Sequence, residues 1–452
     1  MTVQQLFVKT ALACVLASAA VATWAQAPVM DLKQVYQAAL EQDATIRASR
    51  ATADSGRERL PQARAGLLPQ VSASAGRNNN NLDTTAPNIL GTPVTTNEKY
   101  LSDNKTLQLR QPLVNMQRWL QFQQAKSVVE EVEANLDRDL QNLVVRVAGV
   151  YFEALMADEQ LDLVLAQKKT YTALVDAAKK GLAAGSGTRT DIDDAQSRLD
   201  MAAAQELEAR QNQDLARRQL QLLVNQPVNQ IAKLNVAALQ LSAPMPANLD
   251  EWTRKAEQAS PEIRGMQARL DASRREVGKA QAGHLPTVDA VAQWSNSGSE
   301  NITRVNSRFE NKTIGLQLNI PLYSGGYVNS TIRQAVAEQT RAEESLEALR
   351  RDLGVRVHKE YRGVSEGVLR VRALEQAARS AEQMMKSTQM SLTAGSRTQL
   401  DVLNAQQQFT LALRDLAQAR LVYLLSRVRL ASLVGDDAMV SVEQVNGSLR
   451  VR

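Results

Sequence analysis

The chain of 452 residues carries the same Thr-x-x-Asp motif twice, each time shortly after a glycine. The two glycines lie 210 positions apart (395 minus 185). In such a motif the threonine caps a new helix and the aspartate three residues later completes a capping box, while the glycine ends the helix before it. The chemistry expected of these residues is hydrogen bonding at a turn between two helices. They are Gly185, Thr188 and Asp191 in the first copy, and Gly395, Thr398 and Asp401 in the second.

Residue types that carry catalysis or bind metals are sparse. His284 and His358 have no carboxylate or second histidine at catalytic or metal-binding spacing, and the only cysteine is Cys14. The sequence contains neither a glycine-rich phosphate loop nor a nucleophile motif. We therefore expect no enzyme activity, no catalytic residues, no metal site and no cofactor.

The composition favours long, partly buried helices over a compact globular core. Aromatic residues make up 4% of the chain, and alanine, glutamine, leucine and arginine dominate. The net charge of +5 arises from interspersed acidic and basic residues. There is no basic stripe, so nucleic acid is not an expected partner.

The N-terminus has the pattern of a secretory signal peptide. Lys9 supplies the positive charge, residues 11–22 form a short apolar core, and a cleavage site lies near Ala25 or Ala27. Pro28 directly after Ala27 favours Ala25, so the predicted signal is residues 1–25. Since Cys14 lies inside it, the mature chain is expected to be exported and free of disulfides.

The rest of the sequence indicates an internal duplication. Two repeats are joined by a connector at 227–247 and followed by a tail at 435–452. Each long helix would measure about 100 Å and must lie against other long helices. The polar segments 77–98 and 295–308 are predicted as loops. The first repeat, 31–226, is predicted to contain a helix at 31–65, strands at about 68–80 and 100–112, a long helix at 115–182 and a return helix at 188–225. The second repeat, 248–434, is predicted to contain a helix at 249–282, strands at about 285–296 and 309–321, a long helix at 328–393 and a return helix at 398–434.

The four predicted strands alternate apolar and polar residues, as strands do when one face meets lipid. Four strands cannot close a barrel, and open edges are not tolerated in hydrocarbon. A membrane barrel would therefore need several chains: three would supply twelve strands and two would supply eight. The alternative is a soluble sandwich sheet. The prolines predicted to bound the strands at the rim next to the helices are Pro69, Pro112, Pro286 and Pro321.

These features together resemble the TolC family of outer-membrane efflux and secretion channels. The resemblance spans nearly all of the mature chain and is most specific in Gly-Ser-Arg-Thr-Gln-Leu-Asp-Val-Leu-Asn-Ala at 395–405 and in the paired Leu-Pro and Pro-Leu strand boundaries. It implies a mainly helical, homotrimeric duct. Each chain would give four strands to a shared barrel of twelve in the outer membrane of a Gram-negative bacterium, continued into the periplasm by a helical tunnel. It also implies a periplasmic adaptor and an inner-membrane RND or ABC transporter as partners, besides outer-membrane lipid.

The resemblance also implies roles for residues near the two turns. Asp401 matches the first position of an acidic ring at the constriction of the tunnel, and Asp191 and Asp194 occupy the corresponding places in the first copy. Asn404 stands where many members have a second aspartate. Arg397 matches an arginine that links neighbouring hairpins, while Leu392 replaces its tyrosine partner.

Other interpretations of these residues remain open. A capping box explains Asp191 and Asp401 without a pore, and the two roles are compatible. Arg397 is otherwise a solvated turn residue. The resemblance implies a passive conduit for drug efflux, type I protein secretion, or both. The alternative is a periplasmic adaptor built on a coiled coil, which would be exported too.

Overall fold

The computed structural model describes residues 29–299 and 307–450, so the predicted signal peptide lies outside it. The chain divides into two compact units. Among the described residues, the hairpin unit comprises 29–47, Asp139–Ala256 and 354–450. The sheet unit comprises Ala48–Arg138 and Glu257–Leu353. Two long helices, α5 (Met116–Ala183) and α9 (Tyr327–Thr393), contribute to both, and they confirm the predicted helices at 115–182 and 328–393.

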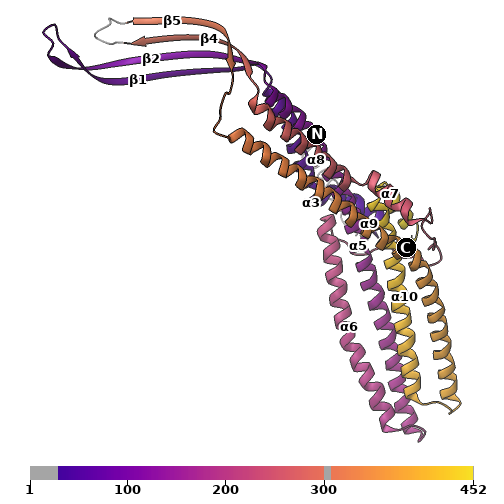
Figure 1. Ribbon diagram of the computed structural model, residues 1–452. Coiled ribbons are helices and arrows are strands. Elements are labelled where there is room, and N and C mark those ends of the chain that lie inside the picture. The colour runs from indigo at the N-terminus through magenta and orange to yellow at the C-terminus, as the bar shows by residue number, and fades with distance from the viewer. Residues whose placement is uncertain (1–28, 300–306, 451–452) are drawn as a thin grey trace, which may run out of the picture. The chain divides into compact units, whose positions relative to one another are not determined.

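In the hairpin unit, the chain reverses direction after each long helix and continues as a return helix. Helix α5 is followed by α6 (Arg189–Val224), and α9 by α10 (Gln399–Leu433), which gives the two antiparallel pairs of Figure 1. Helix α6 buries one small side chain every seven residues, and this spacing lets helix axes approach closely. These residues are Ala195, Ala202, Ala209 and Ala216.

The connector and the C-terminal tail pack against these helices. Strand β3 (Lys233–Leu234) in the connector pairs with β6 (Leu449–Arg450) in the tail, and α11 (Ala438–Asn446) precedes β6. Tyr151 donates its hydroxyl to the carbonyl of Ala232 at 3.0 Å. Tyr423 donates its own to the carbonyl of Ser242 at 2.9 Å. Both tyrosines are fully buried, so they hold the connector to the bundle through satisfied polar groups.

The two shorter helical segments are interrupted, which corrects the predicted continuous helices at 31–65 and 249–282. The first consists of α2 (Leu32–Gln42), α3 (Ala44–Arg57) and α4 (Arg59–Ala65). It breaks at Asp43, whose carboxylate accepts from the backbone nitrogen of Ile46 at 3.0 Å and so caps α3. The second consists of α7 (Leu249–Ala259) and α8 (Pro261–Gln281), with the short 3-10 turn Ala282–His284 after it. Its break falls at Pro261, which lacks the N–H that would continue the helix.

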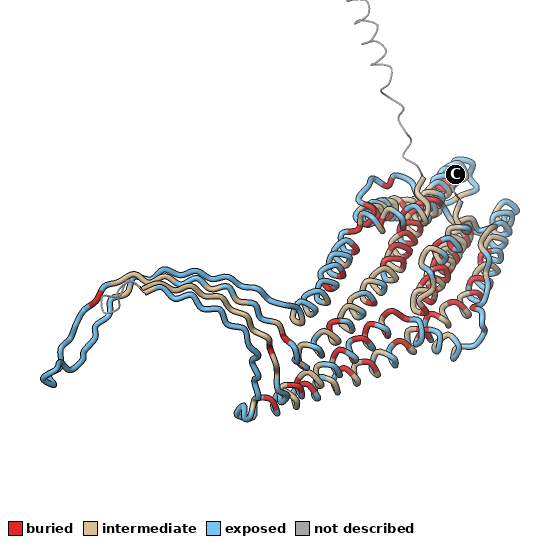
Figure 2. The backbone as a smooth tube through the Cα atoms, turned by 90° about the horizontal axis from the view of Figure 1, so that it is seen from above, coloured by how far each residue is buried: buried red, intermediate tan, exposed pale blue. Residues whose placement is uncertain are grey.

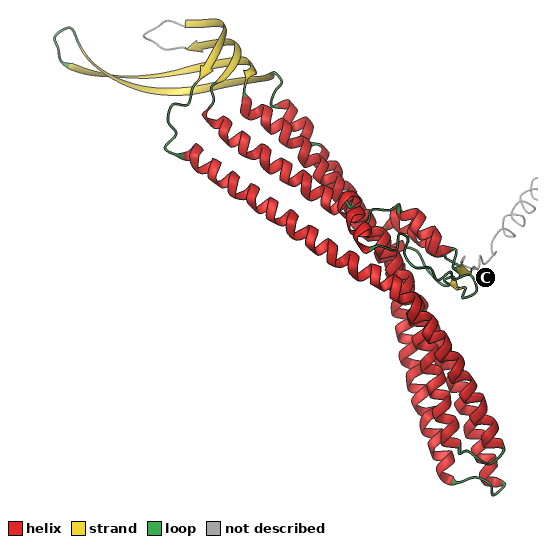
Figure 3. Ribbon diagram, turned by 45° about the vertical axis from the view of Figure 1, so that its right-hand side comes forward, coloured by secondary structure: helices red, strands yellow, loops and turns green. Residues whose placement is uncertain are grey.

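The sheet unit carries four antiparallel strands in the order β1-β2-β4-β5. They are β1 (Gln70–Pro87), β2 (Pro93–Val114), β4 (Thr287–Ser299) and β5 (Ser307–Asn319). Figure 3 shows the strands as one group in yellow, and Figure 2 shows that most of their residues are exposed. Among the described residues, no strand pairs with the outer edges of β1 and β5.

The first hairpin is longer than predicted, because β1 and β2 extend through most of the segment 77–98 that was expected to be a loop. Cross-strand side chains replace apolar packing there: the hydroxyls of Thr85 and Thr95 lie 2.7 Å apart, and Asn97 donates to Asn81 at 2.8 Å. In the second hairpin β4 continues to Ser299 and β5 begins at Ser307, so the predicted loop 295–308 is also shorter. Residues 300–306 lie outside the described part.

The register places apolar and polar side chains on opposite faces of the sheet, as the alternation predicted. One row of the apolar face joins Val71, Leu109, Ala292 and Ile314 across all four strands. Pro69, Pro286 and Pro321 flank strand ends. Pro112 instead lies inside β2, which continues to Val114 past a break in register, so the expectation that Pro112 bounds this strand is wrong. A bulge accommodates it, since proline offers no ladder donor.

Among the described helices, α5 alone is long and apolar enough to cross a membrane by length and composition. In its most apolar window 44% of the residues are buried. Val144, Val147 and Tyr151 on α5 are fully enclosed within the hairpin unit, which is the environment of a core helix.

Candidate constriction at the hairpin turns

The two predicted turns have the same geometry. Gly395 has φ +75°, its N–H donates to the carbonyl of Leu392, and the next N–H, of Ser396, donates to Ser391, each at 3.0 Å. This pair of bonds is the Schellman motif, which needs a left-handed residue. Gly185 has φ +70°, its N–H donates to the carbonyl of Leu182, and the N–H of Ser186 donates to Gly181, each at 3.0 Å.

Each return helix begins with the predicted capping box. The Thr398 hydroxyl caps the backbone nitrogen of Asp401, and the Asp401 carboxylate accepts from the Thr398 nitrogen at 3.0 Å. Thr188 and Asp191 repeat the arrangement, with the latter bond at 2.9 Å. The capping interpretation is confirmed in both copies, and both carboxylates also face the positive end of a helix dipole.

The charge of Asp401 is stabilised in place. Hydrogen bonds from the backbone and side chain of Thr398, with a smaller contribution from the nearby Arg397 guanidinium, lower the pKa of this carboxyl. Arg397 Nη1 lies 3.8 Å from Asp401 Oδ1, and both side chains are exposed to solvent. Within one chain Arg397 therefore sits beside its own carboxylate, while Gly187 stands at the matching place in the first copy.

Asn404 is held by a residue that sequence reasoning missed. Arg198 on α6 donates from Nη2 to Asn404 Oδ1 and from Nη1 to Gln407 Oε1 on α10, each at 2.8 Å. Asn404 thus links the two repeats of the chain. Asp194, its counterpart on α6, is half-buried beyond the cap. Arg198 and Asn404 lie 206 positions apart, so local patterns gave no signal of this contact.

Between the helices that the turns connect, an apolar cluster joins both helical pairs. Leu392 packs against this cluster from α9. A leucine side chain cannot donate a hydrogen bond, so this position contributes apolar packing. The buried residues of the cluster are Tyr171, Leu174, Ala202, Val402 and Leu403.

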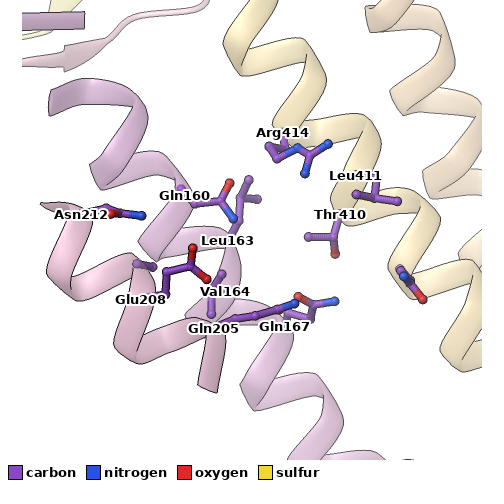
Figure 4. A pocket seen from close by; sticks show the side chains of 12 residues that line it. Gln160, Leu163, Val164, Gln167, Gln205, Glu208, Asn212, Thr410, Leu411 and Arg414 are labelled. Atoms are coloured by element: carbon purple, nitrogen blue, oxygen red, sulfur yellow. The ribbon is translucent and has the colours of Figure 1, made fainter. Parts of the chain in front are cut away.

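A groove of about 340 Å³ lies between α5, α6 and α10. Figure 4 shows amide and hydroxyl side chains around it together with apolar ones, and Glu208 from α6 and Arg414 from α10 are its charged members. Gln160 and Gln167 reach it from α5. The groove offers hydrogen-bonding groups beside an apolar part formed by Leu163, Val164, Ala209 and Leu411. Among residues 29–299 and 307–450, no cluster of three or more His, Asp or Glu is placed to hold a metal ion.

Comparison with known proteins places both repeats in one family. The model of the outer membrane efflux protein family matches residues 35–226 and 252–436. The chain is 32% identical over 426 residues to the alkaline protease secretion protein AprF of Pseudomonas aeruginosa, covering 92% of this chain and 88% of that protein. It is 31% identical to the proteases secretion protein PrtF of Dickeya chrysanthemi, covering 90% and 89%.

A third relative and a solved structure support the same family and fold. The outer membrane protein TolC of Escherichia coli is 29% identical, covering 90% of this chain and 82% of that protein. The channel CusC superposes with a TM-score of 0.77 over 90% of this chain and 92% of that one, at 17% identity, which shows the shared fold. The chain therefore belongs to the outer membrane efflux protein family and has the TolC fold, built from two repeats of the family's helix and strand pattern.

Proposed function

We propose that this protein is the outer-membrane channel of a tripartite export system, a passive homotrimeric conduit that serves type I protein secretion. The observation that carries the proposal is the four-stranded sheet, which has one apolar face, one polar face and two edges without partners among the described residues. Such a sheet cannot be stable in hydrocarbon alone, because its edge N–H and C=O groups would be unsatisfied. Copies joined edge to edge close a barrel with a polar lumen.

The proposed cargo is a secreted protein, and drug efflux is the second candidate. Two relatives at 31% and 32% identity carry protease secretion in their names, and together they support the first choice. The match to the model of the outer membrane efflux protein family supports the second.

We place the constriction at the hairpin turns, at the periplasmic end of the tunnel. Asp401 and Asp191, with Asn404 and Asp194 one turn further along, line it in this proposal, so a ring of several copies favours cations over anions. The lowered pKa of Asp401 supports a permanent charge there. Arg397 lies at the turn with an exposed side chain and is the proposed link to a neighbouring hairpin.

The expected partners are a periplasmic adaptor and an inner-membrane RND or ABC transporter. The groove between α5, α6 and α10 is the proposed seat for the adaptor, because its amide-rich sides suit a polar helical hairpin. The only cysteine, Cys14, lies in the predicted signal. A Thr410→Cys variant would therefore give a unique crosslinking site in the mature protein.

The experiment is deletion of the gene in its own host, followed by proteomics of the culture medium and drug sensitivity assays. A defined protein should disappear from the culture medium of the deletion strain, and the wild-type gene should restore it. An unchanged set of secreted proteins together with increased drug sensitivity would overturn the secretion assignment in favour of efflux. Fractionation decides the remaining alternative, since an adaptor would be absent from the outer membrane.

A further inference from the structure

On the apolar face of the sheet, charged side chains follow the apolar ones at the end away from the helices. The row of Ala73, Leu107 and Trp294 is the last apolar one, and Lys312 of β5 completes it. Trp294 donates its indole N–H to Glu310 at 3.1 Å, and Lys312 lies 3.1 Å from the same carboxylate. Tryptophan with charged neighbours is typical of the level where hydrocarbon meets headgroups.

Two further rows on this face carry basic residues on three of the four strands. Lys105 lies in the first row, beside Ala75 and Asn296, and Arg77 and Arg308 lie in the second. Their register places them on the same face as the apolar band, because side chains two residues apart along a strand share a face. Four cations and two carboxylates leave a net charge of +2 here. The six residues are Arg77, Lys105, Arg308 and Lys312, with Asp103 and Glu310.

The cations of this belt are accessible. Lys312 is 75% exposed, and Arg77, Lys105 and Arg308 are exposed as well. Among the described residues, Lys312 alone of the four forms an ion pair, so the other three positive charges lack a counterion in this part of the chain. The band below them spans Val288 to Trp294, about 20 Å along the strand. A partner that meets both surfaces at once must be apolar beneath and negatively charged above.

We propose that this belt, formed by Arg77, Lys105, Arg308 and Lys312, binds the phosphate groups of glycolipids in the outer leaflet of the membrane. The acyl chains lie against the apolar band, and the phosphates accept hydrogen bonds from the lysines and arginines at its upper edge. The inference rests on the proposed membrane location of the sheet. It adds a ligand class and a binding surface to it.

The experiment uses the full-length protein, purified in dodecyl maltoside, and lipid A carrying two phosphates, with dephosphorylated lipid A as the comparison. Native mass spectrometry counts the lipids retained. Each basic residue near a charged lipid surface contributes roughly a fivefold factor in affinity. The wild type should therefore prefer the phosphorylated form by more than about tenfold, and K105Q/R308Q/K312Q should lose that preference.

Two variants serve as controls. K99Q removes a cation from the same face of β2, about 20 Å further along the strand, and should keep the preference. K105R/K312R retains the charge and should keep it too. Equal retention of both lipids by the wild type, or an unchanged preference in the triple variant, would overturn the proposal. Single-channel conductance of the same samples distinguishes failure of the lipid-binding proposal from failure of the proposed function. Samples that form channels but show no lipid preference refute only the belt. Samples that form no channels refute the proposed function.

Discussion

Arg198 on α6 and Asn404 on α10 form a hydrogen bond of 2.8 Å, which joins the two return helices within their first three turns. The same guanidinium also donates a hydrogen bond to Gln407, so one side chain of the first repeat binds two side chains of the second. The contact is exposed, which limits its free energy to about 1 kcal/mol. It nevertheless lies next to the proposed constriction, where a small shift in the spacing of the hairpins changes the width of the opening.

Replacing Arg198 with alanine should therefore raise the resting conductance of the channel in planar bilayers. Loss of about 1 kcal/mol shifts a closed-to-open equilibrium up to roughly fivefold. The matched control is Arg218→Ala, since Arg218 lies on the same helix, is 69% exposed and, among the described residues, forms an ion pair with Asp214 of its own helix. Equal conductance in wild type and Arg198→Ala, or an equal rise in the control, would contradict this role.

Removing the threonine caps should loosen the starts of the return helices. Thr398→Ala should cost about 1 kcal/mol of local stability, and Thr188→Ala should cost a similar amount in the first copy. Hydrogen exchange of the first turn of each helix measures the effect. Thr398→Ser keeps an oxygen that accepts from the Asp401 nitrogen, so exchange should stay near wild type. Faster exchange in Thr398→Ser than in Thr398→Ala would refute the capping account.

The turn glycine should not tolerate a side chain. Gly395 has φ +75°, a conformation that costs an L-residue about 1–2 kcal/mol, so Gly395→Ala should be destabilising. Gly149 offers the opposite case, because it lies inside α5 and an added Cβ would meet nothing within 4 Å. Gly149→Ala should be neutral or stabilising by up to about 1 kcal/mol. Limited proteolysis and denaturant midpoints of both variants test this contrast.

The pH dependence follows from the lowered pKa of Asp401. A carboxyl with a depressed folded pKa stabilises the fold fully above its ordinary value of 3.8, and this stabilisation is lost as the pH falls through the folded pKa. The charge should therefore persist from pH 8 to about 5. If Asp401 lines the opening, the reversal potential in a salt gradient should stay constant over that range. Asp401→Asn should lower cation preference already at pH 7, and unchanged selectivity would remove Asp401 from the constriction.

The turns were predictable because their physics is local. A glycine followed three residues later by a threonine, and then by an aspartate, specifies a helix end and a helix start within seven residues. The break at Asp43 followed the same rules, since an aspartate that caps Ile46 can end one helix and begin another. It was missed because the apolar spacing continued through it.

Other features depend on partners that are distant in sequence. The polar segment 77–98 resembles a loop in isolation, yet Thr85 and Asn97 find hydrogen-bond partners on the opposite strand and extend the sheet. Pro112 alone predicts the end of β2, but a bulge lets the strand continue to Val114. The grip of Arg198 on Asn404 spans 206 positions, and no local pattern indicates it.

The central claim is that one chain supplies only part of a membrane barrel, and the mass of the intact complex tests it most directly. The protein should be extracted from the outer membrane in mild detergent and measured by native mass spectrometry without crosslinking. We predict a complex of three chains, whose edge strands β5 and β1 pair between copies. A single-chain mass for material that still conducts ions in bilayers would contradict the account.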